Sequence, residues 1–268
     1  PRVARTVSVG VLSAQLVLDV VLLDLADNGA PVVMWLGGWS DGIGIALVAD
    51  RFAAVLMVIS TFIALAVLLY AISQQRDVDP VDESATAFHP AMLLMAAAVC
   101  NAFVAGDLFN LFVSFEILLT ASYVLLTLGG TGERVRAGAP YIVVSLLSSI
   151  IFLAAVALVY AATGTVNMAE LAGRIGTLPP GTADVLQALL LVAFGIKAAI
   201  WPMSAWLPDS YPNAPAPVSA VFAGLLTKVG IYAIIRTHLV LFGGEGFDAV
   251  MMWAALATML VGIAGAVV

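Results

Sequence analysis

Long apolar runs with few charged residues constrain the fold of this chain more than any other feature. A run of about 20 such residues crosses the ~30 Å hydrocarbon layer of a bilayer as a helix, and a helix satisfies its own backbone hydrogen bonds in lipid. The chain is 63% hydrophobic and only 10% charged. It is therefore predicted to be an all-α polytopic membrane protein. The expected transmembrane helices, about eight in number, are 6–26, 51–72, 90–106, 108–128, 138–162, 184–203, 214–240 and 248–268.

The N-terminal part departs most from a plain apolar pattern. Gln15, Asp19 and Asp24 interrupt the first run, so this helix is expected to pack against other helices or to tilt. The loop 28–50 has strand-like residues around Gly-rich turns, which predicts a small hairpin. Arg and Lys counts in the loops favour a cytoplasmic N-terminus, which would place this hairpin on the outer surface.

Several function classes are excluded by composition. The net charge of −7 is scattered, partly in the loop 76–84, and no basic patch indicates nucleic-acid binding. One cysteine, Cys100, allows no intrachain disulfide framework. The two histidines, His89 and His238, form no metal-ligand pattern with it, and no phosphate-binding loop or nucleophile elbow occurs. We therefore expect no cofactor, no metal and no chemistry on an organic substrate.

Three ionisable residues lie well inside apolar runs: Glu116, Lys197 and Lys228. An unpaired lysine at a helix centre costs about 2.5–3.5 kcal/mol, so these charges should face the bundle interior, pair with each other or touch internal water. One interpretation is a structural ion pair between helices. The other is an ion path, in which a carboxylate that approaches and withdraws loads and unloads a proton on a lysine. A third charge on a separate helix favours the ion path.

Lys197 lies five residues before Pro202. Proline removes a backbone hydrogen bond, so the helix is expected to break near the preceding turn and free carbonyls around Lys197. Broken helices at membrane depth occur where the backbone lines a cavity or binding site. The alternative is an ordinary helix end.

Two polar residues accompany Lys228 in the same run. Thr227 is adjacent, and its hydroxyl could relay a proton together with water. His238 has a side chain suited to proton transfer. It lies beside Arg236 near the end of the run, however, and an interfacial histidine is the simpler interpretation.

Polar residues on the neighbouring runs also have two interpretations each. Asp107 directly precedes the run that holds Glu116, where it would act as a helix N-cap or as a proton access site. Ser145, Ser148 and Ser149 form a polar stripe, which would be a water-bearing face or an ordinary helix-packing surface.

Three motifs carry a resemblance to a known family. They are GDLFNLFVSFEILLTASYVLL (106–126), GIKAAIWPMSAWLPDSYPNAPAPVSAVFAGLLTKVGIYAIIR (195–236) and, more weakly, LGGWSDGIGIALVAD (36–50). They resemble the antiporter-like membrane subunits shared by respiratory complex I and the multisubunit Mrp-type cation/proton antiporters, and most of all the D subunits of the latter.

The resemblance implies roles for individual residues and an organisation for the chain. Glu116 matches the family's glutamate on its fifth helix, Lys197 the lysine on its broken seventh helix, and Lys228 the central residue of its eighth. Residues 1–89 would be the N-terminal helices with the outer hairpin 28–50. Residues 90–240 would be a first five-helix unit with its broken helix near Pro202, and 241–268 the start of a second unit in a longer protein.

The function implied is that of an ion-translocating subunit, not an enzyme, in a multisubunit sodium/proton antiporter of the cell membrane. Its partners would be other membrane subunits, protons, monovalent cations and the lipid bilayer. A proton would reach Lys197 through a hydrated half-channel, and pairing with Glu116 would set its release toward Lys228. The competing hypotheses are a proton-pumping membrane subunit of an NADH:quinone oxidoreductase or related hydrogenase, and a structural scaffold.

Overall fold

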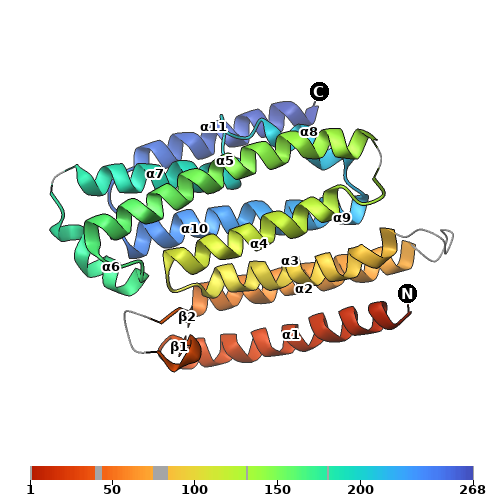
Figure 1. Cartoon of the computed structure of the whole chain (residues 1–268), viewed down its shortest axis with the longest axis horizontal. Helices are drawn as coiled ribbons and strands as arrows, with labels where there is room; N and C mark the ends of the chain where they lie inside the picture. Colours follow the sequence, from red (N-terminus) through yellow and green to blue (C-terminus); the bar gives the residue numbers. More distant parts are fainter. Residues whose placement is uncertain (1, 40–43, 75–83, 131, 180, 268) are drawn as a thin grey trace.

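Long helices lying side by side make up most of the protein (Figure 1). The computed structural model describes residues 2–39, 44–74, 84–130, 132–179 and 181–267; most of the charged loop 76–84 lies outside these ranges. The elements, in chain order, are α1 Arg2–Asn28, β1 Val32–Trp35, η1 Leu36–Gly38, β2 Ala46–Ala49, α2 Arg51–Gln74, α3 Ser84–Val104, α4 Leu108–Leu126, α5 Gly132–Thr163, α6 Met168–Arg174, η2 Ile175–Thr177, α7 Thr182–Lys197, α8 Trp206–Ser210, η3 Tyr211–Asn213, α9 Ala216–Val221, η4 Phe222–Leu226, α10 Thr227–Val240 and α11 Asp248–Val267.

Seven helices in the described ranges are long and apolar enough to cross a membrane, one fewer than the eight predicted. The α9–η4–α10 segment counts as one of them, since Ala216–Val240 is continuous. The predicted span 184–203 is the difference: its helix, α7, ends at Lys197 and turns follow. The remaining predicted spans correspond to helices with shifted ends. The class of fold, an all-α multi-span membrane protein, is confirmed.

The interrupted first run forms one helix, α1, which packs along α2 and touches α3. Asp19 is 1% exposed and faces this contact. The expectation that the polar residues of this run require packing against other helices is therefore correct for Asp19, whereas Asp24 is exposed.

The loop 28–50 forms the expected small hairpin. Strands β1 and β2 pair antiparallel, with Val33 opposite Val48. Gly106 donates a backbone hydrogen bond to Ala46 at 2.9 Å, and a Cβ added to Gly106 would lie 2.8 Å from Val48. The hairpin thus sits on the link between α3 and α4, at the end of the bundle where α6 also lies (Figure 1).

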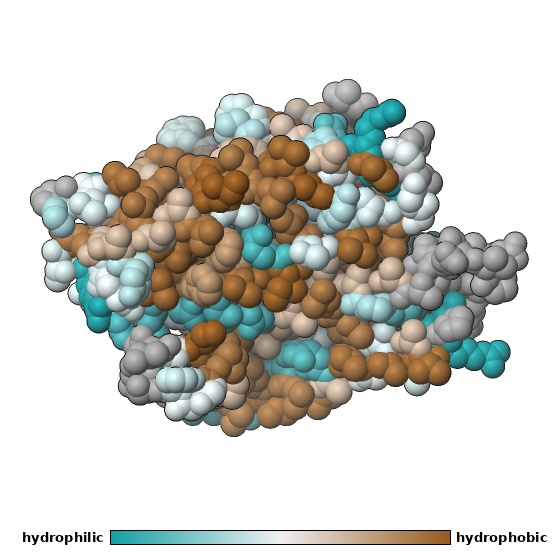
Figure 2. Space-filling model, viewed as in Figure 1, coloured by the Kyte–Doolittle hydropathy of each residue, from teal (hydrophilic) through white to brown (hydrophobic). Residues whose placement is uncertain are grey.

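Aromatic side chains fill the centre of the bundle where α4, α5 and α7 meet. The rings of Phe152 and Phe194 lie edge to face at 4.7 Å between centroids, and Phe115 lies 6.0 Å from each of them. Apolar side chains also cover most of the bundle's outer face in the view of Figure 2, as expected of a surface in contact with lipid. No residue of α11 is buried.

Candidate functional site

The end of α7 at Lys197 is built by the backbone before the chain reaches Pro202. Ala199 adopts a left-handed conformation, φ 55°. The amide of Ile200 donates to Gly195 at 3.0 Å and that of Ala199 to Ile196 at 3.2 Å. This is the Schellman pattern of helix termination, which normally has glycine at the left-handed position. The predicted break is present, and its immediate cause is this cap rather than the proline, which lies exposed in the turns beyond.

Neighbouring side chains and helices hold the broken end in place. The indole Nε1 of Trp206 donates to the carbonyl of Ile196 at 3.1 Å, so one of the last carbonyls of α7 is satisfied. Helix α10 approaches so closely at Gly230 that an added Cβ would lie 2.6 Å from the amide nitrogen of Ala198. Only glycine fits there without a backbone shift.

Lys197 and Glu116 are joined through one hydroxyl group. The Ser149 hydroxyl, on α5, donates to Oε1 of Glu116, on α4. The same Ser149 Oγ accepts from Nζ of Lys197 at 3.1 Å. No direct Glu116–Lys197 contact within 4.0 Å is among the ion pairs of the described residues. Helices α4, α5 and α7 therefore meet at a lysine–serine–glutamate series of two hydrogen bonds.

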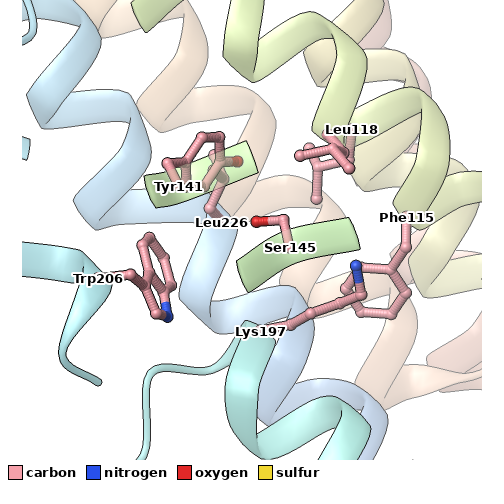
Figure 3. Close-up of a pocket in the computed structure, with 8 residues that line it drawn as sticks. Phe115, Leu118, Tyr141, Ser145, Lys197, Trp206 and Leu226 are labelled. Atoms are coloured by element: carbon pink, nitrogen blue, oxygen red, sulfur yellow. The ribbon is translucent and has the colours of Figure 1, made fainter. Parts of the chain in front are cut away.

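The amine of Lys197 borders a small cavity of about 30 Å³ (Figure 3). Its Nζ lies 5.0 Å from the centroid of the Phe115 ring, within the range of a cation–π contact. Ser145, Tyr141 and Trp206 also line the cavity, and leucines complete the wall. A volume of this size accommodates a water molecule. The amine of Lys197 therefore lies next to both the Ser149 hydroxyl and a space able to hold water.

The three serines of the predicted stripe have different surroundings. Ser145 lines the cavity beside Lys197. Ser148 is fully buried and donates to the carbonyl of Ala193 at 2.8 Å, which ties α5 to α7. Ser149 bridges the two charged residues. The helix-packing role is therefore present at Ser148, while a water-bearing face stays a prediction.

Lys228 lies apart from this cluster. Its side chain is exposed, and its Nζ donates to the carbonyl of Ala223 and, at 3.3 Å, to Oγ1 of Thr227. A stretch of π-helix, Phe222–Leu226, ends two residues before it; no sequence pattern had indicated this π-helix. The hydrogen bonds found in the described chain do not connect Lys228 to Glu116 or Lys197, so its role in a relay stays a prediction.

His238 connects three helices at the far end of α10. Its Nδ1 lies 3.2 Å from Gln187 of α7, and its Nε2 lies 3.1 Å from Oδ1 of Asp248 at the start of α11. These contacts give His238 a structural role in joining helices. They do not test a role for it in proton transfer.

Asp107 caps α4. Its Oδ1 accepts from the amide of Asn110 at 2.6 Å, and the Asp107 side chain is 5% exposed. Burial raises the pKa of the Asp107 carboxyl above its ordinary value. Its Oδ2 has no hydrogen-bond partner in the described ranges, and the residue lines a cavity of about 410 Å³ between the hairpin and α5. The N-cap is therefore present, and a role in proton access stays open.

Some supporting residues had no distinct sequence signal. Ser149 was one of three equivalent serines, and Ala199 and Gly230 are residue types common throughout the chain. Arg236, expected near a helix end, is 9% exposed and forms an ion pair with Asp50 at the end of the hairpin. Only the packing of helices distant in sequence reveals these partners.

Comparison with known proteins decides the family. Residues 105–268 match the family described as NADH:quinone oxidoreductase/Mrp antiporter, TM. The chain belongs to this family. It is 41% identical, over 97% of its length, to the D subunit of a Na(+)/H(+) antiporter from Alkalihalophilus pseudofirmus. It is 43% identical, over 85% of its length, to the D subunit of a probable K(+)/H(+) antiporter from Rhizobium meliloti.

A solved structure agrees with this assignment. The fold matches a chain in the structure of the Mrp complex from Dietzia sp. DQ12-45-1b, with a TM-score of 0.86 and 34% identity, over 99% of this chain and 49% of that one. The chain spans 52% and 42% of the two curated relatives. The resemblance inferred from the three motifs is confirmed at the level of the family, while the division into a first and a second unit stays a prediction.

Proposed function

We propose that this chain is the ion-translocating part of a membrane subunit in a multisubunit monovalent cation/proton antiporter of the cell membrane, and that it is not an enzyme. The observation that carries the proposal is the series Lys197–Ser149–Glu116, with one hydroxyl between an amine and a carboxylate. The similarity to antiporter D subunits supports it. The relatives' names include both Na(+) and K(+), so we propose sodium as the exchanged cation and potassium as the alternative.

The hydrogen-bond directions suit a proton transfer. As arranged, Lys197 donates to Ser149, and Ser149 donates to Glu116. When the lysine ammonium passes a proton to the serine oxygen, the serine passes its own proton to the carboxylate. A neutral amine and a neutral carboxylic acid result, and the serine remains a hydroxyl. Neutralising both charges together avoids an isolated charge in an apolar bundle.

For the next step, Glu116 would return the proton through Ser149 to Lys197, and the ammonium group of Lys197 would then pass a proton through water and hydroxyls to Lys228. The cavity beside Lys197 has space for water, and Thr227 offers a hydroxyl next to Lys228. Because Lys228 is exposed in this chain, the proposal requires other protein segments to cover it. Those would come from the rest of a subunit about twice as long and from its partner subunits in the membrane.

The test uses the full-length subunit in its assembled complex in everted membrane vesicles. Glu116→Gln and Lys197→Met should each abolish sodium-driven proton movement while the complex still assembles. Glu170→Gln is the matched control, because Glu170 is a carboxylate of α6 whose ion pair with Arg174 lies at the surface. Normal exchange in Glu116→Gln or Lys197→Met would refute the proposed relay.

A second candidate function comes from the same family, because the family description also names NADH:quinone oxidoreductase. The charged cluster would serve equally in a proton-pumping membrane subunit of such a complex or of a related hydrogenase. Copurification of the full-length protein with iron–sulfur or flavin subunits would favour this alternative. Copurification with other membrane subunits and no redox centre would favour the antiporter.

A further inference from the structure

A second carboxylate lies inside the membrane-spanning bundle, away from the cluster described above. Asp19 is in the middle of α1 and is 1% exposed. Asp24, five residues later on the same helix, is exposed and accepts from Asn28 at 2.9 Å. The two aspartates differ in environment, although they share a helix.

The hydrogen-bond partners of Asp19 are all neutral. Gln15 Nε2 lies 2.7 Å from Oδ1, and Thr61 Oγ1, on α2, lies 2.6 Å from Oδ2. Thr61 Oγ1 in turn lies 3.7 Å from Sγ of Cys100 on α3, where either atom is able to donate. These contacts join α1, α2 and α3 through one carboxyl, one amide, one hydroxyl and one thiol.

No cationic group of the described ranges compensates a charge at this position. The ion pairs found there do not include Asp19. Arg5 is 14 residues away along α1, or about 21 Å, and Arg51 is ten residues from Thr61 along α2, or about 15 Å; Arg51 pairs with Asp27. The other titratable or charged groups on the helices in contact are Arg2 (17 residues from Asp19), Asp24 and Asp27 of α1, Tyr70 of α2, and His89 and Cys100 of α3.

An ionised carboxylate without a counter-charge is costly in a medium of low dielectric, whereas a neutral acid with its hydrogen bonds made is not. A metal cation would need several oxygen ligands, but the side chains in contact offer one amide nitrogen and one hydroxyl at hydrogen-bond distance. A proton is therefore the ligand that this site fits.

We propose that Asp19 is a proton-binding site, in which the carboxyl holds a proton as a neutral acid between α1 and α2. The acid O–H donates to Thr61, the Thr61 hydroxyl donates to Cys100, and Gln15 donates to the other carboxyl oxygen. Both carboxyl oxygens of Asp19 and the Thr61 hydroxyl then have hydrogen-bond partners. This proton is held in place and takes no part in the relay of Glu116 and Lys197, so the inference is independent of the proposed transport function.

Infrared spectroscopy of the purified full-length protein in its complex, at neutral pH, tests the protonation directly. Asp19→Asn should remove absorption in the C=O region of protonated carboxyl groups. Asp24→Asn, the matched control on the same helix, should instead remove absorption of an ionised carboxylate. Loss of a carboxylate band in Asp19→Asn, or an unchanged protonated-carboxyl region, would overturn the proposal.

A second variant keeps the test decisive if Asp19→Asn fails to assemble. Thr61→Val retains Asp19 and removes one hydrogen-bond partner, so the protonated-carboxyl band should persist and shift to higher frequency. A spectrum in which Thr61→Val alters only the carboxylate region, or leaves the protonated-carboxyl region unchanged, would also overturn the proposal.

Discussion

The surroundings of Glu116 and Asp19 differ in one respect that decides what each carboxyl can do. Glu116 is half-buried and lies one hydroxyl away from the amine of Lys197. Asp19 is almost fully buried and its hydrogen-bond partners are all neutral. A carboxylate next to a lysine is able to exchange a proton with it, because the two charges appear and disappear together. A carboxyl among neutral groups has no such partner, and we infer that it keeps its proton.

The largest difference between the two sites should appear in transport. Glu116→Gln removes the group proposed to exchange a proton with Lys197, so proton movement in vesicles should fall by about 100-fold or more. Asp19→Asn retains a neutral side chain of the same shape and hydrogen-bonding capacity. Its transport should equal that of the unmodified protein, as measured by sodium-driven pH change in the same vesicle preparation.

The proposed difference between Glu116 and Asp19 would be wrong if Glu116→Gln and Asp19→Asn changed transport to the same extent. Loss of transport in an assembled Asp19→Asn complex would mean that Asp19 belongs to the relay. Retained transport in both variants would mean that the two carboxyls serve only to hold helices together.

The free energy of unfolding should be more sensitive to changes around Asp19 than around Glu116, the reverse of the order expected for transport. Thr61→Val leaves an oxygen of Asp19 without its partner in a buried site and should lower the free energy of unfolding by about 1–3 kcal/mol. Thr120→Val, on the helix of Glu116, removes only an exposed hydroxyl that donates to the Glu116 backbone carbonyl at 3.0 Å. Its effect should lie within about 0.5 kcal/mol. Denaturation of the two detergent-solubilised variants measures the difference, and equal effects would contradict the special environment of Asp19.

A smaller effect concerns the backbone beside Lys197. Ala199 holds the left-handed conformation at the end of α7, which costs an alanine about 1 kcal/mol or more and a glycine much less. Ala199→Gly should therefore stabilise the protein by up to about 1 kcal/mol after the greater flexibility of glycine in the unfolded chain is counted. Thermal unfolding checks this, and a destabilised variant would show that the cap is not strained.

The sequence predicted the broad architecture because apolar runs and buried charges are local signals. Spans such as 108–128 and 51–72 needed only length and hydropathy, and the break after Lys197 was foreseen from Pro202. The helix of the predicted span 184–203 ends earlier than expected, at Lys197, because the α7 cap at Ala199 has no sequence signature when alanine replaces the usual glycine. A helix end formed by backbone geometry alone is invisible to composition.

The partners of the charged residues depend on which helices meet, and this was much harder to predict. Ser149 and Ser148 are adjacent in sequence, yet one bridges Lys197 to Glu116 and the other binds a backbone carbonyl. Asp19 was interpreted only as an interruption of an apolar run, because its partner Thr61 lies 42 residues away. Lys228 was expected to face the bundle interior, pair with another charge or touch internal water, and its side chain is exposed in this chain.

The central claim is that the Ser149 hydroxyl connects Lys197 to Glu116, and comparison of Ser149→Ala with Ser148→Ala tests it most directly. A hydrogen bond to a charged group contributes about 1.5–3 kcal/mol, so Ser149→Ala should slow proton movement in vesicles at least tenfold. Ser148→Ala, one residue away, removes a buried hydroxyl of the same kind and should transport at the unmodified rate. Equal rates in the two variants, whether both normal or both reduced, would contradict the account.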